Sequence, residues 1–206
     1  FYAWQETLRR VGNVTAVGDE GGYAAEFWTP EEALATMVAA IERCGYRPGQ
    51  DISLAIDVAA SKLHERHLYE FHKSGRPAAT TKELISVLEG LAHRFPILSI
   101  EDGLAENDWS GWKELTARLG DTVMLVGDDL FATHADAIQR GIDEHVANAT
   151  LIKPNQVGTV SETLDAVRVS HHGGYRTVIS HRSGDTEDTF IADLSVAAGS
   201  MFIKAG

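Results

Sequence analysis

The chain has 206 residues, of which 44% are hydrophobic, so it is long enough for one large domain with a buried core. Its formal net charge of −12 argues against nucleic acid and anionic membranes as partners. The sequence contains no apolar run near the roughly 18 residues that span a bilayer, and its start lacks the apolar region of a signal peptide. It has only one cysteine, which cannot form an internal disulfide bond. We therefore expect a reducing, cytoplasmic location.

Short apolar, β-branched segments alternate along the chain with stretches of helical periodicity. The strands are expected at Thr15–Glu20, Ile52–Val58, Ile97–Asp102, Val123–Asp128, Thr150–Lys153, Thr177–His181 and Met201–Lys204. The helices are expected at Pro30–Cys44, Thr81–Arg94, Trp109–Leu119, His134–His145, Thr159–His172 and Thr186–Ala198. Strands that alternate with helices of this length predict a parallel sheet covered by helices. The polar stretch His64–Thr80 is expected to form a surface excursion.

Three helix starts carry capping signals. Thr29 precedes Pro30, with Glu32 three residues after Thr29, which predicts a capping box with proline at the first helical position. Thr81 and Asp108 are expected to cap the next two helices.

The strand ends favour a closed barrel over an open sheet. Nearly every expected strand ends in a charged or polar residue, namely Glu20, Asp57, Glu101, Asp128, Lys153, His181 and Lys204. In an open sheet only the strand ends near a reversal of strand order surround a ligand, whereas in a barrel all strand ends meet at one mouth. Seven strands are one fewer than a barrel needs, so we expect the barrel to be incomplete at both ends of this chain.

Three acids end consecutive strands. Asp57, Glu101 and Asp128 would point into one site, where three like charges repel one another unless a cation neutralises them. Carboxylate oxygens without cysteine or histidine suit magnesium or manganese. Each acid alone could equally cap the following helix, but this explanation is poor for all three together, and we expect Asp102 and Asp129 to be caps or supporting residues.

Positive groups follow on the next strand ends. Lys153 ends an apolar run, and a desolvated lysine beside a cation has a lowered pKa and can act as a base. The alternative is a lysine that only pairs with the carboxylates. His181, Arg182 and Ser183 stand in one strand-to-helix turn, where the guanidinium and helix N–H groups could bind a phosphate or carboxylate. Lys204 adds a further cation.

These residues lie in strings that resemble the enolase family. The strings are VGDEGG, IDVAAS, SIEDGL, VGDDLF, IKPNQVGT, SHRSGDTEDT and IADL, and they occur in the family's order over essentially the whole chain. The resemblance implies a TIM-type (β/α)8 barrel over residues 1–206, with the family's N-terminal capping domain, an upstream catalytic glutamate and closing helices outside this chain.

The resemblance also implies the roles of the site residues. Asp57, Glu101 and Asp128 would hold one of two Mg²⁺ ions, and Lys153 would take the C2 proton of 2-phosphoglycerate. Glu20 would help the C3 hydroxyl to leave, giving phosphoenolpyruvate. The substrate would contact the residues His181, Arg182, Ser183 and Lys204. The family further implies a homodimer or larger homo-oligomer.

The sequence departs from the family near the substrate. Met201 and Phe202 stand where glycine and glutamine are usual, and Ala205 replaces a threonine. One alternative is therefore a paralogue of secondary metabolism that acts on a phosphonate analogue, of the carboxyphosphonoenolpyruvate synthase type. A second is a non-catalytic binding protein on the same scaffold, which the intact set of acids and lysines argues against.

Overall fold

A curled parallel sheet forms the centre of the computed structural model, which describes residues 1–71 and 76–206. Its strands follow the order β1-β5-β6-β7-β8-β9, and all neighbouring pairs are parallel. These strands are β1 (Leu54–Asp57), β5 (Ile97–Glu101), β6 (Met124–Gly127), β7 (Ala149–Ile152), β8 (Arg176–Ser180) and β9 (Phe202–Lys204).

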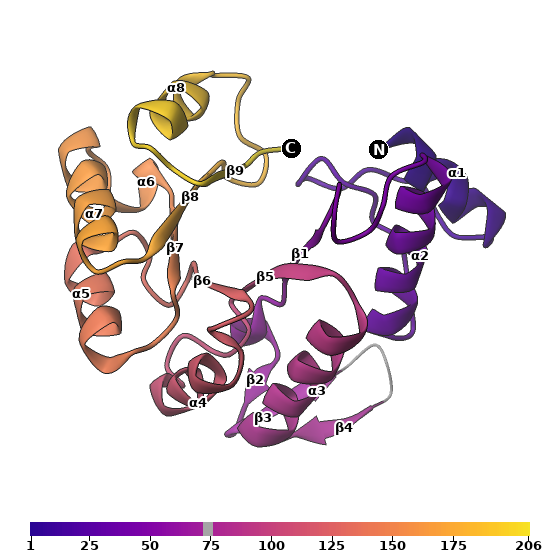
Figure 1. The fold of residues 1–206 in the computed structure, drawn as a ribbon, viewed down its shortest axis with the longest axis horizontal. Coiled ribbons are helices and arrows are strands. Elements are labelled where there is room, and N and C mark those ends of the chain that lie inside the picture. Colours follow the sequence, from indigo (N-terminus) through magenta and orange to yellow (C-terminus); the bar gives the residue numbers. More distant parts are fainter. Residues whose placement is uncertain (72–75) are drawn as a thin grey trace.

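Helices lie on the outer side of the arc of strands (Figure 1). The helices are α1 (Tyr2–Arg10), α2 (Pro30–Arg43), α3 (Thr81–Arg94), α4 (Trp109–Leu119), α5 (Ala135–Glu144), α6 (Pro154–Val157), α7 (Val160–His172) and α8 (Phe190–Ala197). The strand–helix alternation and the outer helices confirm the expected partial TIM-type barrel. Within the described residues, no helix is both long and apolar enough to cross a membrane.

The main hydrophobic core lies between the sheet and its helices. Side chains from β1, β5 and the buried faces of α3 and α4 supply much of it, including the fully buried Trp112 and Ile100. A second, smaller cluster lies on the other face of the sheet and joins residues of β6, β7, β8 and β9. The barrel interior is therefore filled with side chains below the strand ends.

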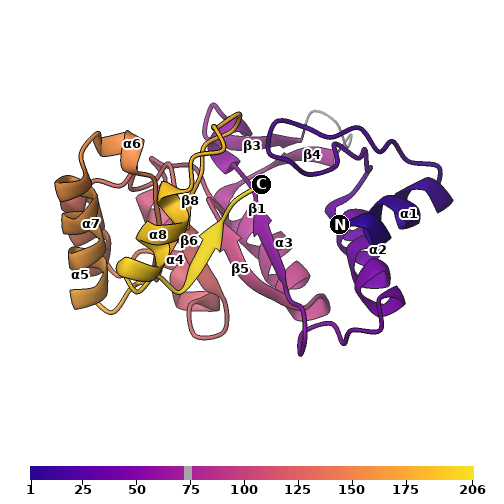
Figure 2. The same cartoon turned by 90° about the horizontal axis from the view of Figure 1, so that it is seen from above.

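The excursion after β1 folds as a small sheet of its own. A short 3₁₀ helix (Ala60–Lys62) leads into the antiparallel strands β2 (His64–Glu65), β3 (Leu68–Phe71) and β4 (Arg76–Ala79). Residues 72–75, which belong to the expected excursion, lie outside the described residues. Figure 2 shows β3, β4 and α6 toward the same end of the molecule.

The prediction of a strand at Thr15–Glu20 is wrong. Val17 makes one isolated antiparallel bridge to Tyr23, and the backbone turns back on itself. Gly18 N–H donates to Gly22 O at 2.9 Å and Gly21 N–H donates to Gly18 O at 3.0 Å, with Gly21 at φ +80°. The backbone groups that a strand would offer to its neighbours are thus used within the turn.

Two helix starts also differ from the expectation. Thr80, not Thr81, caps α3, and it forms a reciprocal capping box with Glu83. Helix α8 begins at Phe190 rather than at Thr186. The cap at Asp108 is confirmed by its hydrogen bond from Gly111 N–H at 3.0 Å. The Thr29 side chain accepts a hydrogen bond from Glu32 N–H at 3.2 Å, as expected for a cap. The Glu32 side chain, however, accepts from Trp28 N–H and not from Thr29 N–H, so the reciprocal capping box is not formed.

Candidate active site

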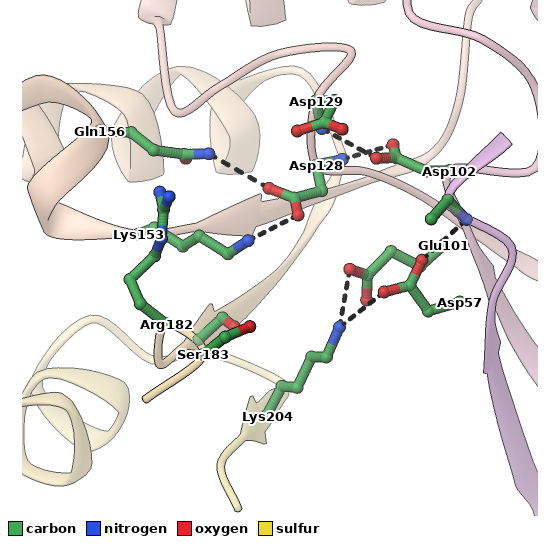
Figure 3. A network of polar contacts seen from close by, with 12 residues as sticks. Asp57, Glu101, Asp102, Asp128, Asp129, Lys153, Gln156, Arg182, Ser183 and Lys204 are labelled. Atoms are coloured by element: carbon green, nitrogen blue, oxygen red, sulfur yellow. Dashed lines mark hydrogen bonds and ion pairs between the residues drawn. The ribbon is translucent and has the colours of Figure 1, made fainter. Parts of the chain in front are cut away.

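Acidic side chains converge at the carboxyl ends of three neighbouring strands (Figure 3). Asp57 ends β1 and Glu101 ends β5, and the two residues are paired in the register of the sheet. Asp128 follows β6 directly. Glu101 and Asp128 are buried, whereas Asp57 is more exposed. Adjacent parallel strands thus gather three carboxylates at one mouth of the barrel.

Two lysines form ion pairs with these acids. Lys153 Nζ lies 2.6 Å from Asp128 Oδ2, and both side chains are largely buried. Lys204 Nζ donates to Glu101 Oε1 at 2.8 Å and to Asp57 Oδ2 at 3.0 Å. Figure 3 shows the two ammonium groups approaching the carboxylates from β7 and β9. The site is therefore a compact network of opposite charges in which each acid has a cationic partner.

The charge network shifts the pKa values of its members. Burial, together with the nearby charge of Asp57, raises the pKa of Glu101 to about 7, although Lys204 opposes this shift. Burial also disfavours the Lys204 ammonium, but Glu101 and Asp57 outweigh it and raise the Lys204 pKa above its usual range. An additional positive charge near Glu101 would therefore be electrostatically favourable.

Asp102 supports the network through the backbone of its neighbours. Its two carboxylate oxygens accept hydrogen bonds from the backbone N–H groups of Asp128 at 2.9 Å and Asp129 at 3.0 Å. The residue adopts φ +42°, which turns its side chain from β5 toward the end of β6. Burial raises the Asp102 pKa to about 7, in spite of these N–H donors. Asp102 thereby fixes the backbone that carries Asp128.

A second group of residues meets at the end of β8. Glu20 accepts a hydrogen bond from Ser183 Oγ, and its other oxygen lies 3.2 Å from Nε2 of the buried His181. The hydrogen bond from Ser183 lowers the Glu20 pKa, and the charges of His181, Lys204 and Lys153 add to this effect. Gly184 N–H donates to Asp19 O at 3.3 Å, so the turn that carries Glu20 is attached to the loop after β8.

The sequence model described as "Enolase, C-terminal TIM barrel domain" matches residues 3–206. The chain belongs to the enolase family. The family resemblance of the motif strings is therefore confirmed, as is the barrel fold.

The enolase barrel brings most of the expected site residues into contact. Lys153 meets Asp128, Lys204 meets Asp57 and Glu101, and Glu20 meets His181 and Ser183. Arg182 is exposed, and its backbone forms a turn with Asp185: its N–H donates to Asp185 Oδ2 at 3.3 Å, and its carbonyl oxygen accepts from Asp185 N–H at 3.1 Å. The roles that the resemblance implies for these residues remain predictions.

Two supporting residues of the enolase site were missed in the sequence. The buried Thr133 accepts from Lys153 N–H at 2.9 Å and donates to Gln156 Oε1 at 2.5 Å. Gln156 Nε2 in turn donates to Asp128 Oδ1 at 3.2 Å. The position of Gln156 within the string IKPNQVGT was a usable signal, whereas nothing local distinguishes Thr133.

The donor set fits a hard divalent cation of the kind that the enolase family usually binds. The acids offer carboxylate oxygens alone, which suit Mg²⁺. The raised pKa of Glu101 shows that the charges of the lysines do not fully offset the burial and mutual repulsion of the acids. Among the described residues, the group whose oxygens all lie within 4.8 Å of one another and that could hold a metal is Asp102, Asp128 and Asp129.

Proposed function

We propose that this protein is a hydro-lyase that converts 2-phosphoglycerate reversibly into phosphoenolpyruvate and water with the help of Mg²⁺. The observation that carries the proposal is the lysine–carboxylate network at one barrel mouth, in which the side chains of Lys153 and Lys204 approach the same group of acids. Membership of the enolase family supports this class of reaction.

The metal ligands are assigned to Asp57, Glu101 and Asp128. Bound there, Mg²⁺ would stabilise the negative charge that develops when a carboxylate substrate loses its α-proton. We favour this set over the one that includes Asp102, because both Asp102 oxygens already accept backbone N–H groups. The side chains of Asp57 and Glu101 instead point toward Lys204 at the mouth (Figure 3).

Lys153 is assigned as the base. It is fixed at the end of β7 by its backbone hydrogen bond to Thr133, and its Nζ is held by Asp128. In its neutral form the amine takes the C2 proton, so that the C–H bond breaks and the electron pair moves toward the carboxylate. Lys204 binds that carboxylate, and the exposed Arg182 binds the phosphate.

Glu20 is assigned to the leaving hydroxyl. The C3–O bond breaks, and the oxygen leaves as water after it gains a proton from Glu20. The hydrogen bond from Ser183 is the largest cause of the low Glu20 pKa. If Ser183 turns to the substrate phosphate, that cause disappears, and the Glu20 pKa rises toward the value that a proton donor needs.

The test is turnover by the complete protein. With Mg²⁺ and 2-phosphoglycerate, we expect phosphoenolpyruvate to form, as measured by its ultraviolet absorbance, and Lys153→Ala to reduce kcat by about 10²- to 10⁴-fold. Unchanged kcat in Lys153→Ala would refute the assignment of the base. We further propose a cytoplasmic homodimer that serves glycolysis, which size-exclusion chromatography with light scattering would test at the level of assembly.

A paralogue with a phosphonate substrate is the second candidate. Ala205 and Gly206 line a cavity of about 470 Å³ together with His181 and Arg182, beside the proposed phosphate contacts. The small side chain of Ala205 leaves more room there than the threonine that is usual in enolases. Turnover of 2-phosphoglycerate near that of ordinary enolases would exclude the paralogue, whereas failure with 2-phosphoglycerate and turnover of a phosphonate analogue would establish it.

A further inference from the structure

The loop between β6 and α5 holds a buried threonine in a backbone conformation that threonine rarely adopts. Ala132 has φ +43° and Thr133 has φ +60°, although neither residue is a glycine. For a β-branched residue such as threonine this left-handed conformation is a genuine outlier, and it costs about 1–3 kcal/mol. Such strain persists only where the surrounding structure imposes it, so the neighbours of this loop must hold Thr133 in place.

Phe131 anchors the loop to the barrel. Its fully buried ring fits into space that two glycines leave free. A Cβ atom at Gly127 would lie 2.5 Å from the ring, and one at Gly141 would lie 2.6 Å from it. Phe131 N–H and Ala132 N–H also donate to Asp128 O, at 3.1 Å and 2.7 Å. The loop is thus fixed next to Asp128 through its backbone as well as through its aromatic side chain.

The Thr133 hydroxyl orients the amide of Gln156. Its oxygen accepts from Lys153 N–H at 2.9 Å, and its single proton is donated to Gln156 Oε1 at 2.5 Å. The amide therefore presents Nε2 to its other neighbour and donates to Asp128 Oδ1 at 3.2 Å. The opposite orientation of the amide would place Oε1 against the carboxylate, with no proton between the two oxygens.

Asp128 is held through both of its oxygens. Oδ1 accepts from Gln156, whereas Oδ2 lies 2.6 Å from Lys153 Nζ (Figure 3). The last torsion of an aspartate side chain has only broad intrinsic preferences, so its orientation depends on such partners. Two donors on separate oxygens fix that torsion, and Lys153 alone would not. Gln156 lies in α6, three residues after Lys153, so one short segment supplies both donors.

We propose that Gln156, oriented by Thr133, is a positioning residue for the pair of Asp128 and Lys153. It turns the Asp128 carboxylate so that Oδ2 faces Lys153 and holds the amine in one place at the barrel mouth. The catalytic consequence rests on the proposed function of Lys153 as the base, but the orientation of the carboxylate does not. Gln156 acts through Asp128 and needs no contact with a reacting atom.

Three variants of the complete protein separate this role from simple support of the fold. Gln156→Met keeps the length of the side chain and removes the donor to Asp128. Gln156→Glu keeps the size of the side chain and an acceptor for Thr133, but it places an oxygen against the Asp128 carboxylate. Gln139→Met is the matched control, because the exposed Gln139 also donates to a carboxylate, that of Asp143, at 2.9 Å.

Steady-state kinetics with 2-phosphoglycerate at saturating Mg²⁺ give the first readout. A displaced base impairs the chemical step more than it impairs substrate binding, so kcat should fall while KM changes by less than about threefold. We expect about a tenfold fall of kcat in Gln156→Met, as for the loss of one hydrogen bond to a charged group, and at least as large a fall in Gln156→Glu. Gln139→Met should match the wild type.

Two kinetic results would overturn the proposal. If Gln156 only fills space and accepts from Thr133, Gln156→Glu retains the wild-type kcat, because it preserves both properties. If Gln156→Met and Gln139→Met have equal kcat values, the donor to Asp128 has no part in catalysis.

Crystal structures of the same variants in EDTA give a readout that needs no activity. We expect the Asp128 carboxylate to rotate in both Gln156 variants, so that Oδ2 alone no longer faces Lys153 Nζ, and to keep its orientation in Gln139→Met. If one Gln156 variant does not fold, the other carries the test. An unmoved carboxylate overturns the proposal whatever the activity. A wild-type protein that does not turn over 2-phosphoglycerate instead refutes the proposed function and leaves the structural test of Gln156 intact.

Discussion

Removal of the Lys153 ammonium should destabilise the protein strongly when no metal is bound. Its Nζ lies 2.6 Å from Asp128 Oδ2, and the two side chains are only 14% and 11% exposed. In Lys153→Met, Asp128 keeps one side-chain donor, Gln156 Nε2 at 3.2 Å, and loses its cation. Loss of one partner of a buried ion pair costs about 3 kcal/mol, because the remaining charge is left uncompensated.

Urea denaturation in EDTA and in excess Mg²⁺ measures this effect. We expect Lys153→Met to lose about 3 kcal/mol of unfolding free energy in EDTA and clearly less in Mg²⁺, since a cation at Asp128 would replace the missing charge. The exposed Lys82 on α3 provides the control, because Lys82→Met should have little effect in either buffer. The reasoning is refuted if Lys153→Met matches Lys82→Met, or if Mg²⁺ leaves its deficit unchanged.

Three further predictions concern the same site. Thr133→Val should lose about 1–3 kcal/mol of unfolding free energy, because Lys153 N–H is left without its acceptor. Thr133→Ser keeps a hydroxyl and should retain most of the wild-type stability. Equal losses of the two variants in urea denaturation would contradict this role. Because the Glu101 pKa is about 7, Glu101 holds a proton below that pH, and cation binding must release this proton. The Mg²⁺ affinity measured by calorimetry should therefore be about tenfold weaker at pH 6 than at pH 8. An Mg²⁺ affinity that does not change with pH would contradict this coupling. Asp57→Asn should abolish turnover at the Mg²⁺ concentration that saturates the wild type, and retained turnover there would remove Asp57 from the ligand set.

The strand ends could be predicted because they depend on local pattern alone. An apolar run such as Thr150–Lys153 that stops at a charged residue places that residue at the mouth of any parallel barrel. The charged residues on β1, β5, β6, β7 and β9 were therefore found in the sequence, and the structure brings them into one network.

The errors occurred where short-range hydrogen bonds compete with regular structure. Before α8, Thr186 N–H donates to Asp185 Oδ1 at 2.8 Å and Phe190 N–H donates to Asp188 Oδ1 at 2.8 Å. Such side-chain acceptors hold the backbone in turns that periodicity does not reveal, so the helix begins later than expected. The supporting role of Thr133 arises from tertiary contact between separate loops and has no local signal at all.

The position of a bound metal ion tests the central claim most directly. Crystals of the protein soaked in Mn²⁺, a substitute for Mg²⁺ that scatters anomalously, would show where the cation binds. We predict an ion contacted by the carboxylates of Asp57, Glu101 and Asp128, with Lys153 Nζ beside it. An ion held by Asp102 and Asp129 instead, or no ion at the barrel mouth at saturating Mn²⁺, would contradict the assignment of the site.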